Sequence, residues 1–298
     1  ELDEINDTLF NKYNDEFHMY WDDNEDKYIS VTTLIGKFEQ PYDKEFWSAY
    51  KAFQKLVPQE GFVLEKQKLL NTKKFNKELL GIYNITELEF NKCQQGILDE
   101  WQRTNTLSCE RGTKIHAQLE NSMYKPKLSL QKFGIGGEFT CIKNHTELDL
   151  ENGVYPEYLI YYKSKDEELK LAGQIDLLIK KGNHITIIDY KTNKSIDQKS
   201  YFDSSTKSNT KMKYPLTNIM DCNFWHYTMQ LSMYAWMIQQ LNPDYVIDLL
   251  MIIHFDHDNN VKKYDIEYRK DDVIKMLKYY KYKDTINKQL DKVKPIQY

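Results

Sequence analysis

Residues 171–192, LAGQIDLLIKKGNHITIIDYKT, carry the clearest indication of the fold in this sequence. It contains two short runs rich in Ile and Leu, at 171–180 and 184–190. The Lys-Gly-Asn segment at 181–183 joins them, and a short glycine-containing connection between two such runs is typical of a hairpin. We therefore predict two antiparallel β-strands here.

Charged residues interrupt this apolar pattern. Asp176 lies inside the first run, and Asp189 and Lys191 end the second. A buried carboxylate is costly unless a cation lies beside it, and Lys191 could be that cation. Residues two apart on a strand share a face, and a hairpin brings Asp176 close to the other two. Two carboxylates and one lysine exceed what an ion pair requires, so the hairpin predicts a functional site.

Elements on both sides of the hairpin complete the predicted core, residues 105–298. We expect helices at 105–123, 223–241 and 271–290, and strands at 154–163, 245–255 and 262–268. This order predicts an α/β (α+β) fold with a central mixed β-sheet flanked by helices.

Residues 1–104 are predicted to form an N-terminal hairpin and helical region that packs on this core. The hairpin has its turn at 22–26, and a helix capped by Ser30 or Thr32 follows it.

The second part of that region has a helical pattern that extends over 59–124. We expect breaks near Gly81 and Asn105. Thr86, followed three residues later by Glu89, is a capping box that predicts the start of one helix.

The composition bounds the class of protein. A hydrophobic content of 41% and a charged content of 29% are typical of a globular protein, and 298 residues predict one elaborated domain or a core with a helical addition. No stretch approaches the roughly 20 apolar residues of a membrane span, and the first 30 residues do not resemble a signal peptide. We expect a cytoplasmic protein with no membrane partner.

A basic segment at 192–219 follows the hairpin. From Lys191 to Lys213, both included, the chain has six lysines and two aspartates among many Ser, Thr and Asn residues. This pattern predicts either a mobile loop that contacts nucleic acid or a merely solvated loop. The candidate nucleic-acid contacts are Lys194, Lys199, Lys207 and Lys211. Aromatic residues in the loop could stack on unpaired bases or close the loop onto the protein, and they are Tyr201, Phe202 and Tyr214.

Four short patterns occur in order along the chain. They are GTKIH at 112–116, GQID at 173–176, DYK at 189–191 and QLSMY at 230–234. Together they resemble the GxxxH, GxxD, (D/E)xK and QxxxY motifs of the PD-(D/E)xK nuclease superfamily, in its RecB-like exonuclease branch. The segment at 28–52 also resembles the N-terminus of phage-encoded members. The resemblance implies a restriction-endonuclease-like core and a free-standing, metal-dependent DNA exonuclease.

The resemblance also assigns metal ligands. His116, Asp176, Asp189 and the backbone carbonyl of Tyr190 would hold Mg²⁺ or Mn²⁺, and Glu157 is an additional candidate. Oxygen ligands suit Mg²⁺, and an added imidazole makes Mn²⁺ a good substitute. Hydrolysis of a phosphodiester benefits from such a cation, which neutralises the phosphate and activates water.

The remaining roles follow from the same resemblance. Lys191 would act with Asp176 and Asp189 as a catalytic residue, by orienting water or stabilising charge on the phosphate. Gln230 and Tyr234 would grip a phosphate or orient the DNA end. The expected partners are single-stranded DNA or duplex ends, together with phage or host recombination or replication proteins.

Two cofactors are not expected. The four cysteines, Cys93, Cys109, Cys141 and Cys222, lack the spacing of an iron-sulfur cluster, and no GxxxxGK[ST] motif indicates an ATP site. Two other functions stay open: a structure-specific or restriction-like endonuclease on the same fold, and a non-catalytic DNA-binding module. An RNA substrate, the polarity of digestion and the oligomeric state are open as well.

Overall fold

A computed structural model describes the chain at 19–21, 25–125, 127–142, 150–203, 206–258 and 260–292, with only the backbone described for 284–292. The predicted turn at 22–26 lies largely outside these residues. Contacts divide the chain into two compact units. The sheet unit comprises the described residues of 1–39, 114–201 and 211–298, and the helical unit comprises those of 40–113 and 202–210. The boundary predicted between residues 104 and 105 falls inside one continuous helix and stays a prediction.

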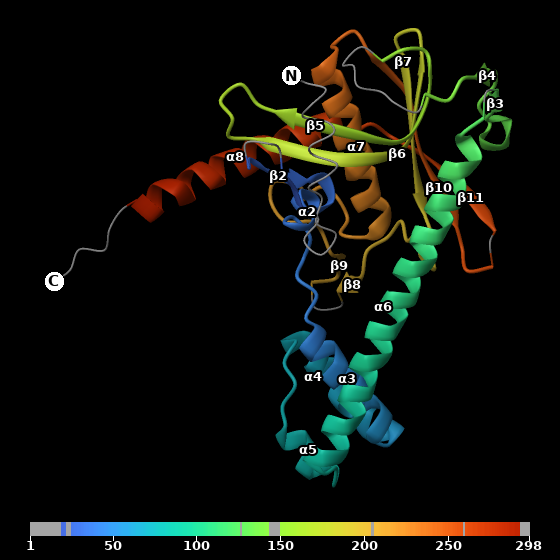
Figure 1. The fold of residues 1–298 in the computed structure, drawn as a ribbon. Helices are drawn as coiled ribbons and strands as arrows, with labels where there is room; N and C mark the ends of the chain where they lie inside the picture. Colours follow the sequence, from blue (N-terminus) through green and yellow to red (C-terminus); the bar gives the residue numbers. More distant parts are fainter. Residues whose placement is uncertain are drawn as a thin grey trace. The chain divides into compact units, whose positions relative to one another are not determined.

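One mixed β-sheet forms the centre of the sheet unit (Figure 1). Its strands are β1 (Met19–Trp21), β2 (Lys27–Ser30), β5 (Gly153–Lys163), β6 (Lys170–Lys181), β7 (His184–Lys191), β10 (Val246–Phe255) and β11 (Val261–Ile266). They follow the order β1-β2-β6-β7-β10-β11, and β5 pairs along β6. Strand β6 is antiparallel to β5 and β7, whereas β10 is parallel to β7. The predicted hairpin and the predicted mixed sheet are confirmed.

Strand β6 pairs with β5 along one edge, and on its other edge two different strands pair with its two ends. Its first residues pair with β2, at Leu171 and Ala172, and its last residues pair with β7, from Leu177 to Lys181. Between these two partners, residues 173–176 pair with none of the described strands on that edge. The sheet therefore opens at the residues where the sequence predicts a site.

Helices cover both faces of this sheet. On one face, Ile185 and Ile187 of β7 belong to a buried cluster that includes the middle of α7. On the other face, Ile188 packs with Met123, the last residue of α6. Because alternate residues of β7 are buried on opposite faces, the strand has the nearly continuous apolar sequence seen in the chain. The helices of this unit are α2 (Val31–Gly36), α7 (Asn223–Leu241), α8 (Lys270–Lys292) and the C-terminal part of α6 (Glu87–Met123).

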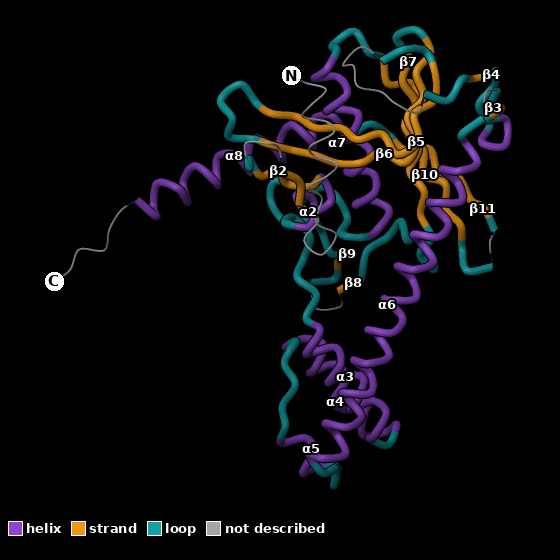
Figure 2. The backbone as a smooth tube through the Cα atoms, viewed as in Figure 1, coloured by secondary structure: helices purple, strands orange, loops and turns teal. Residues whose placement is uncertain are grey.

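The helical unit contains α3 (Lys44–Leu56), α4 (Gln59–Thr72), α5 (Glu78–Ile82) and the first part of α6, as Figure 2 shows. Its aromatic core includes a stacked pair, Phe75 and Phe90, with ring centroids 4.8 Å apart. The predicted capping box is confirmed, since Glu89 N donates to Thr86 Oγ1 over 3.2 Å and Thr86 N donates to Glu89 Oε2 over 3.0 Å.

Three local predictions need correction or completion. The predicted helix break near Asn105 is wrong: α6 continues without interruption, because one residue of modest helix propensity does not end a helix of 37 residues. Gly81 lies within α5, and the interruptions fall on either side of that short helix. Of the two candidate caps of α2, Ser30 is the one that accepts from Thr33 N, over 3.0 Å.

The remaining short elements are β3 (Leu128–Ser129), η1 (Gln131–Phe133), β4 (Glu138–Phe139), β8 (Phe202–Asp203) and β9 (Ser208–Asn209). Within the described part of the chain, no helix is long and apolar enough to cross a membrane.

Candidate active site

The candidate site forms where β6 and β7 separate. The last pair of their ladder is Leu177 with Ile188, so the next residues along the two strands are Asp176 and Asp189. There the ladder is replaced by a side-chain bond, in which Tyr190 N donates to Asp176 Oδ2 over 2.5 Å. The two aspartates of the predicted motifs therefore lie at one opening in the sheet.

His116 reaches this opening from α6. Its Nε2 lies 3.1 Å from the carbonyl oxygen of Tyr190, which can only accept, so Nε2 carries the proton. Its Nδ1 lies 3.5 Å from Asp176 Oδ1 and 3.9 Å from Glu157 Oε1. In the neutral ring Nδ1 is an acceptor, and it faces two carboxylates. A proton or a cation between Nδ1 and the carboxylates would stabilise this arrangement.

Glu157 has an unusual backbone conformation. It lies in β5 with φ of 49°, in the left-handed region that residues other than glycine seldom adopt. It is also skipped by the ladder with β6, which runs from Pro156–Leu177 to Tyr158–Ile175. The side-chain amide of Gln174 donates to the Glu157 carbonyl over 3.3 Å. Backbone strain of this kind is found at functional sites, and here it turns an acid toward the cluster.

Burial and mutual repulsion raise the pKa values of two acids. Burial raises the pKa of Glu157 to about 8, and the charges of Asp176, Glu120 and Asp189 add to the effect. Burial and then Asp189 raise the pKa of Asp176 to about 6, although His116, Lys191 and the N–H of Tyr190 oppose the shift. The cluster therefore holds protons that a cation could displace.

Lys191 pairs with the second aspartate. Its Nζ lies 2.7 Å from Asp189 Oδ2, and the Asp189 side chain is buried, with 3% of its surface exposed. Burial alone would lower the pKa of Lys191, but the charges of Asp189 and Asp176 outweigh it and the pKa lies above the ordinary value. The Nζ also lies 4.6 Å above the ring of Tyr227 in α7. Lys191 is therefore held as a cation at the edge of the opening.

The donor set fits a divalent metal. His116, Glu157 and Asp176 each offer one ligand atom, and these atoms all lie within 4.8 Å of one another. Two carboxylates and one imidazole suit Mg²⁺ or Mn²⁺. Asp189 lies outside this group of three and pairs with Lys191 instead. The Tyr190 carbonyl, a further predicted ligand, accepts from the His116 Nε2–H with one of its two lone pairs.

Gln230 and Tyr234, predicted to contact DNA, are both buried side chains of α7. The Gln230 amide donates to the Tyr234 hydroxyl over 3.3 Å. Burial raises the pKa of Tyr234 well above its usual value, and the charges of Asp189 and Asp176 raise it further. The ring also fits against Gly173, where an added Cβ would lie 2.7 Å from Tyr234 Cε1. This close approach gives a physical reason for glycine at position 173.

The basic segment at 192–219 is only partly a free loop. Lys194, Lys199 and Lys207 are exposed, and Lys211 is half-buried. Its second half is anchored by three residues of the main apolar cluster, Met212, Leu216 and Ile219. Of the aromatic residues considered for stacking, Tyr201, Phe202 and Tyr214 are exposed, and Tyr214 also contacts Tyr279, with centroids 5.1 Å apart.

Sequence reasoning assigned no role to three residues of this site. Gln174 holds the Glu157 backbone, Tyr227 lies beneath Lys191, and Glu120 adds negative charge near Glu157. Gln174 lies within the GQID motif itself, so its polar side chain on a buried strand was the available signal.

Comparison with known proteins identifies the family. A model of the PD-(D/E)XK nuclease superfamily matches residues 130–293, which is more than half of the chain. The chain therefore belongs to the PD-(D/E)XK nuclease superfamily, whose nucleases hydrolyse DNA with divalent metal ions.

Two solved structures are similar to parts of the chain. The crystal structure of SSO0001 is 17% identical with a TM-score of 0.25, and the match covers 42% of this chain and 48% of that protein, or about half its length. A protein from Eubacterium rectale, described as "Putative exonuclease", is 12% identical with a TM-score of 0.32, covering 85% of this chain and 77% of that one. No curated protein matches the sequence significantly.

Proposed function

We propose that this nuclease is a divalent-metal-dependent DNA exonuclease of the RecB-like branch. The observation that supports the proposal is the pair of features at the β6–β7 opening. One is the cluster of His116, Glu157 and Asp176, and the other is the buried ion pair of Asp189 and Lys191. The four ordered motifs and the resemblance of residues 28–52 to phage-encoded members favour a role in phage DNA processing, recombination or replication, in the host cytoplasm.

Each residue has a role in this proposal. A divalent ion held by His116, Asp176 and Glu157, with Asp189 and the Tyr190 carbonyl as further candidate ligands, would neutralise a phosphate and lower the pKa of water. The Nε2–H of His116 donates to the Tyr190 carbonyl and so keeps Nδ1 turned toward the carboxylates.

Lys191 acts on the phosphate. Because its pKa is raised, its Nζ keeps a proton and can donate to an oxygen on which negative charge develops. Asp189 forms an ion pair with the same Nζ at 2.7 Å and so helps to fix its position, and the ring of Tyr227 limits its movement from a second side. Gln230 and Tyr234 are proposed to orient the DNA end indirectly, since both side chains are buried and the charges of Asp189 and Asp176 act on Tyr234.

The lysines of the basic segment are proposed to hold the strand outside the site. Lys194, Lys199 and Lys207 present exposed ammonium groups that phosphates can reach, and Lys211 is half-buried beside them in the sequence. Contacts of this kind bind any sequence and weaken as the salt concentration rises.

The test uses end-labelled linear single-stranded and double-stranded DNA beside a closed circle. Each substrate is incubated with Mg²⁺, Mn²⁺ or EDTA, and Lys191→Ala serves as the inactive control. Loss of the linear substrates alone, dependent on metal and absent in the variant, supports the exonuclease and shows its strand preference. A nicked circle would favour the endonuclease on the same fold. Binding without any cutting would favour the non-catalytic module.

A further inference from the structure

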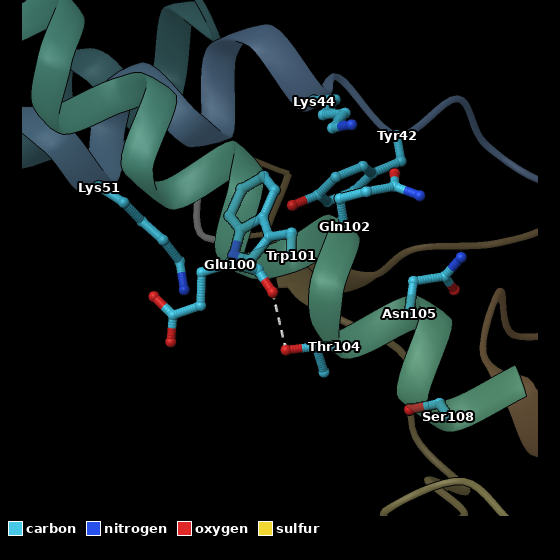
Figure 3. A pocket seen from close by; sticks show the side chains of 9 residues that line it. All are labelled: Tyr42, Lys44, Lys51, Glu100, Trp101, Gln102, Thr104, Asn105 and Ser108. Carbon is cyan, nitrogen blue, oxygen red and sulfur yellow. Dashed lines mark hydrogen bonds between the residues drawn. The ribbon is translucent and has the colours of Figure 1, made fainter. Parts of the chain in front are cut away.

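The helical unit contains a pocket of about 620 Å³ that the family match does not account for (Figure 3). It is formed by α3, the residues just before α3, and the middle of α6, all of which precede the matched residues 130–293. Its volume lies in the range of pockets that bind small ligands, about 300–1,000 Å³. The pocket is therefore large enough for a nucleotide.

Two aromatic rings border this pocket. Tyr42 is 65% exposed, although it is a large aromatic residue, and its ring centroid lies 6.2 Å from that of Trp101, with planes tilted by 59°. Trp101 is half-buried and packs against the apolar core of the helical unit, so its position is fixed. An exposed ring beside an anchored ring is an arrangement on which an unpaired base can stack.

Cations lie beside these rings. Lys51 Nζ is 5.6 Å from the centroid of the Trp101 ring, and Lys44 lines the pocket at the start of α3. Together they outnumber the one acid in the lining, Glu100. The first turn of α3 is capped by Asp43, which accepts from Phe46 N over 2.8 Å, so the two lysines are the groups here that attract an anion.

Polar side chains also line this pocket. Gln102 and Asn105 both project from α6 and line the pocket (Figure 3). Their amides offer donors and acceptors, which match the edges of a base that is not engaged in a base pair. A base in a duplex has neither its faces nor its pairing edge free, so the chemistry of this pocket favours a single strand.

We infer that this pocket binds an unpaired nucleotide of single-stranded DNA. Its base stacks on the exposed ring of Tyr42 with an edge toward Trp101, and its backbone phosphates lie at Lys44 and Lys51. The inference rests on the proposed function only for the class of substrate. It assigns to the helical unit a strand-holding site that is separate in sequence from the metal cluster.

The test measures binding of a fluorescently labelled oligothymidylate to the full chain by anisotropy, in EDTA so that cleavage does not interfere. Tyr42→Ala is expected to weaken binding by about 5-fold or more, since stacking of one base on an aromatic ring corresponds to a change of this size or larger. Lys51→Gln is expected to reduce the slope of log Kd against log salt by about 0.7 for each phosphate that the variant no longer neutralises.

Matched controls keep the result interpretable. Tyr282→Ala removes another tyrosine of similar exposure, 66%, and Lys55→Gln removes another exposed lysine of α3; neither lines the pocket. Both should bind as the unaltered protein does. If Tyr42→Ala and Lys51→Gln bind as well as these controls, the inference is overturned.

The same proteins separate this inference from the proposed nuclease function. Unaltered protein that degrades DNA with Mg²⁺, together with unchanged binding by the pocket variants, rejects the pocket and keeps the nuclease. Protein that cuts no substrate but loses single-strand binding in Tyr42→Ala rejects the exonuclease and keeps the pocket.

Discussion

The two halves of the candidate site differ in how their charges are balanced. On one side, Lys191 neutralises the buried Asp189 at 2.7 Å. On the other side, His116 Nδ1 faces two carboxylates, those of Asp176 and Glu157, over 3.5 and 3.9 Å. In the first half, a lysine of the chain itself balances the charge of the carboxylate. In the second half, the three residues include neither a lysine nor an arginine.

This difference predicts that the half made of His116, Glu157 and Asp176 is the one that would hold a metal. Repulsion and burial raise the pKa values of Glu157 and Asp176, so that the cluster binds protons at a pH where exposed acids have released them. A divalent ion would replace those protons and remove the repulsion. We therefore expect substitutions in the ion pair to affect catalysis and folding directly, and substitutions in the cluster to act through metal affinity.

Lys191→Ala is expected to have the largest effect. The variant lacks the donor proposed for the phosphate, so kcat should fall by at least about 100-fold. It also leaves Asp189 buried without a cation, so the free energy of unfolding should fall by about 3–5 kcal/mol. Mn²⁺ affinity, measured by calorimetry, should change little because the cluster of His116, Glu157 and Asp176 is intact. Denaturant titration and single-turnover cleavage check the other two quantities.

The double variant Lys191→Ala/Asp189→Asn is the control for this prediction. Removing the unpaired charge should restore part of the stability without restoring activity. Asp189→Asn alone should weaken metal binding as well, if its carboxylate is also a ligand. A Lys191→Ala protein that cuts DNA at the rate of the unaltered protein would reject the catalytic assignment.

The second prediction concerns the pH dependence of stability without metal. A carboxyl group whose pKa is raised in the folded state contributes stability fully below its unfolded value, near 4, and loses it as the pH rises through the folded value. For Asp176 and Glu157 the window extends from about pH 4 to the folded pKa values of about 6 and about 8.

The measurement compares denaturant unfolding of the unaltered protein and Glu157→Gln between pH 4 and pH 9, with EDTA and with Mg²⁺. In EDTA the loss of stability toward pH 8 should be smaller in the variant, because one titrating acid is gone. Mg²⁺ should stabilise the unaltered protein more at pH 8 than at pH 5. Parallel profiles for the two proteins would show that Glu157 does not titrate in this range.

Much of the sheet unit was predictable because its signals are local. Two apolar runs and a glycine turn predict the hairpin, and the positions of Asp176, Asp189 and Lys191 on its strands predict that the three lie close together. The capping box at Thr86 is equally local. Where a pattern and its physical cause lie within a few residues, the sequence is sufficient.

Other features depend on residues distant in sequence. From the sequence, Glu157 is only an additional candidate ligand, and no local pattern indicates its positive φ, which the structure shows with β6 beside it and the Gln174 amide on its carbonyl. The expected break at Asn105 failed because helix propensity is a weak signal inside a long helix. The pocket at Tyr42 joins two segments that no motif connects.

Gly173→Ala is expected to have the smallest effect. It tests the packing of the Tyr234 ring against Gly173, beside the site. A Cβ at this position would lie 2.7 Å from Tyr234 Cε1 and 3.1 Å from its hydroxyl oxygen, and the buried ring has little room to move. We expect a loss of about 1–3 kcal/mol in the free energy of unfolding, as for other overpacked cores. Gly96→Ala is the matched control, because an added Cβ there meets nothing within 4 Å in the interior of α6, so it should leave stability unchanged or raise it. Since the charges of both Asp176 and Asp189 act on Tyr234, displacement of the ring should lower metal affinity and kcat together. A variant as stable as Gly96→Ala would show that the ring moves freely and that glycine is not required there.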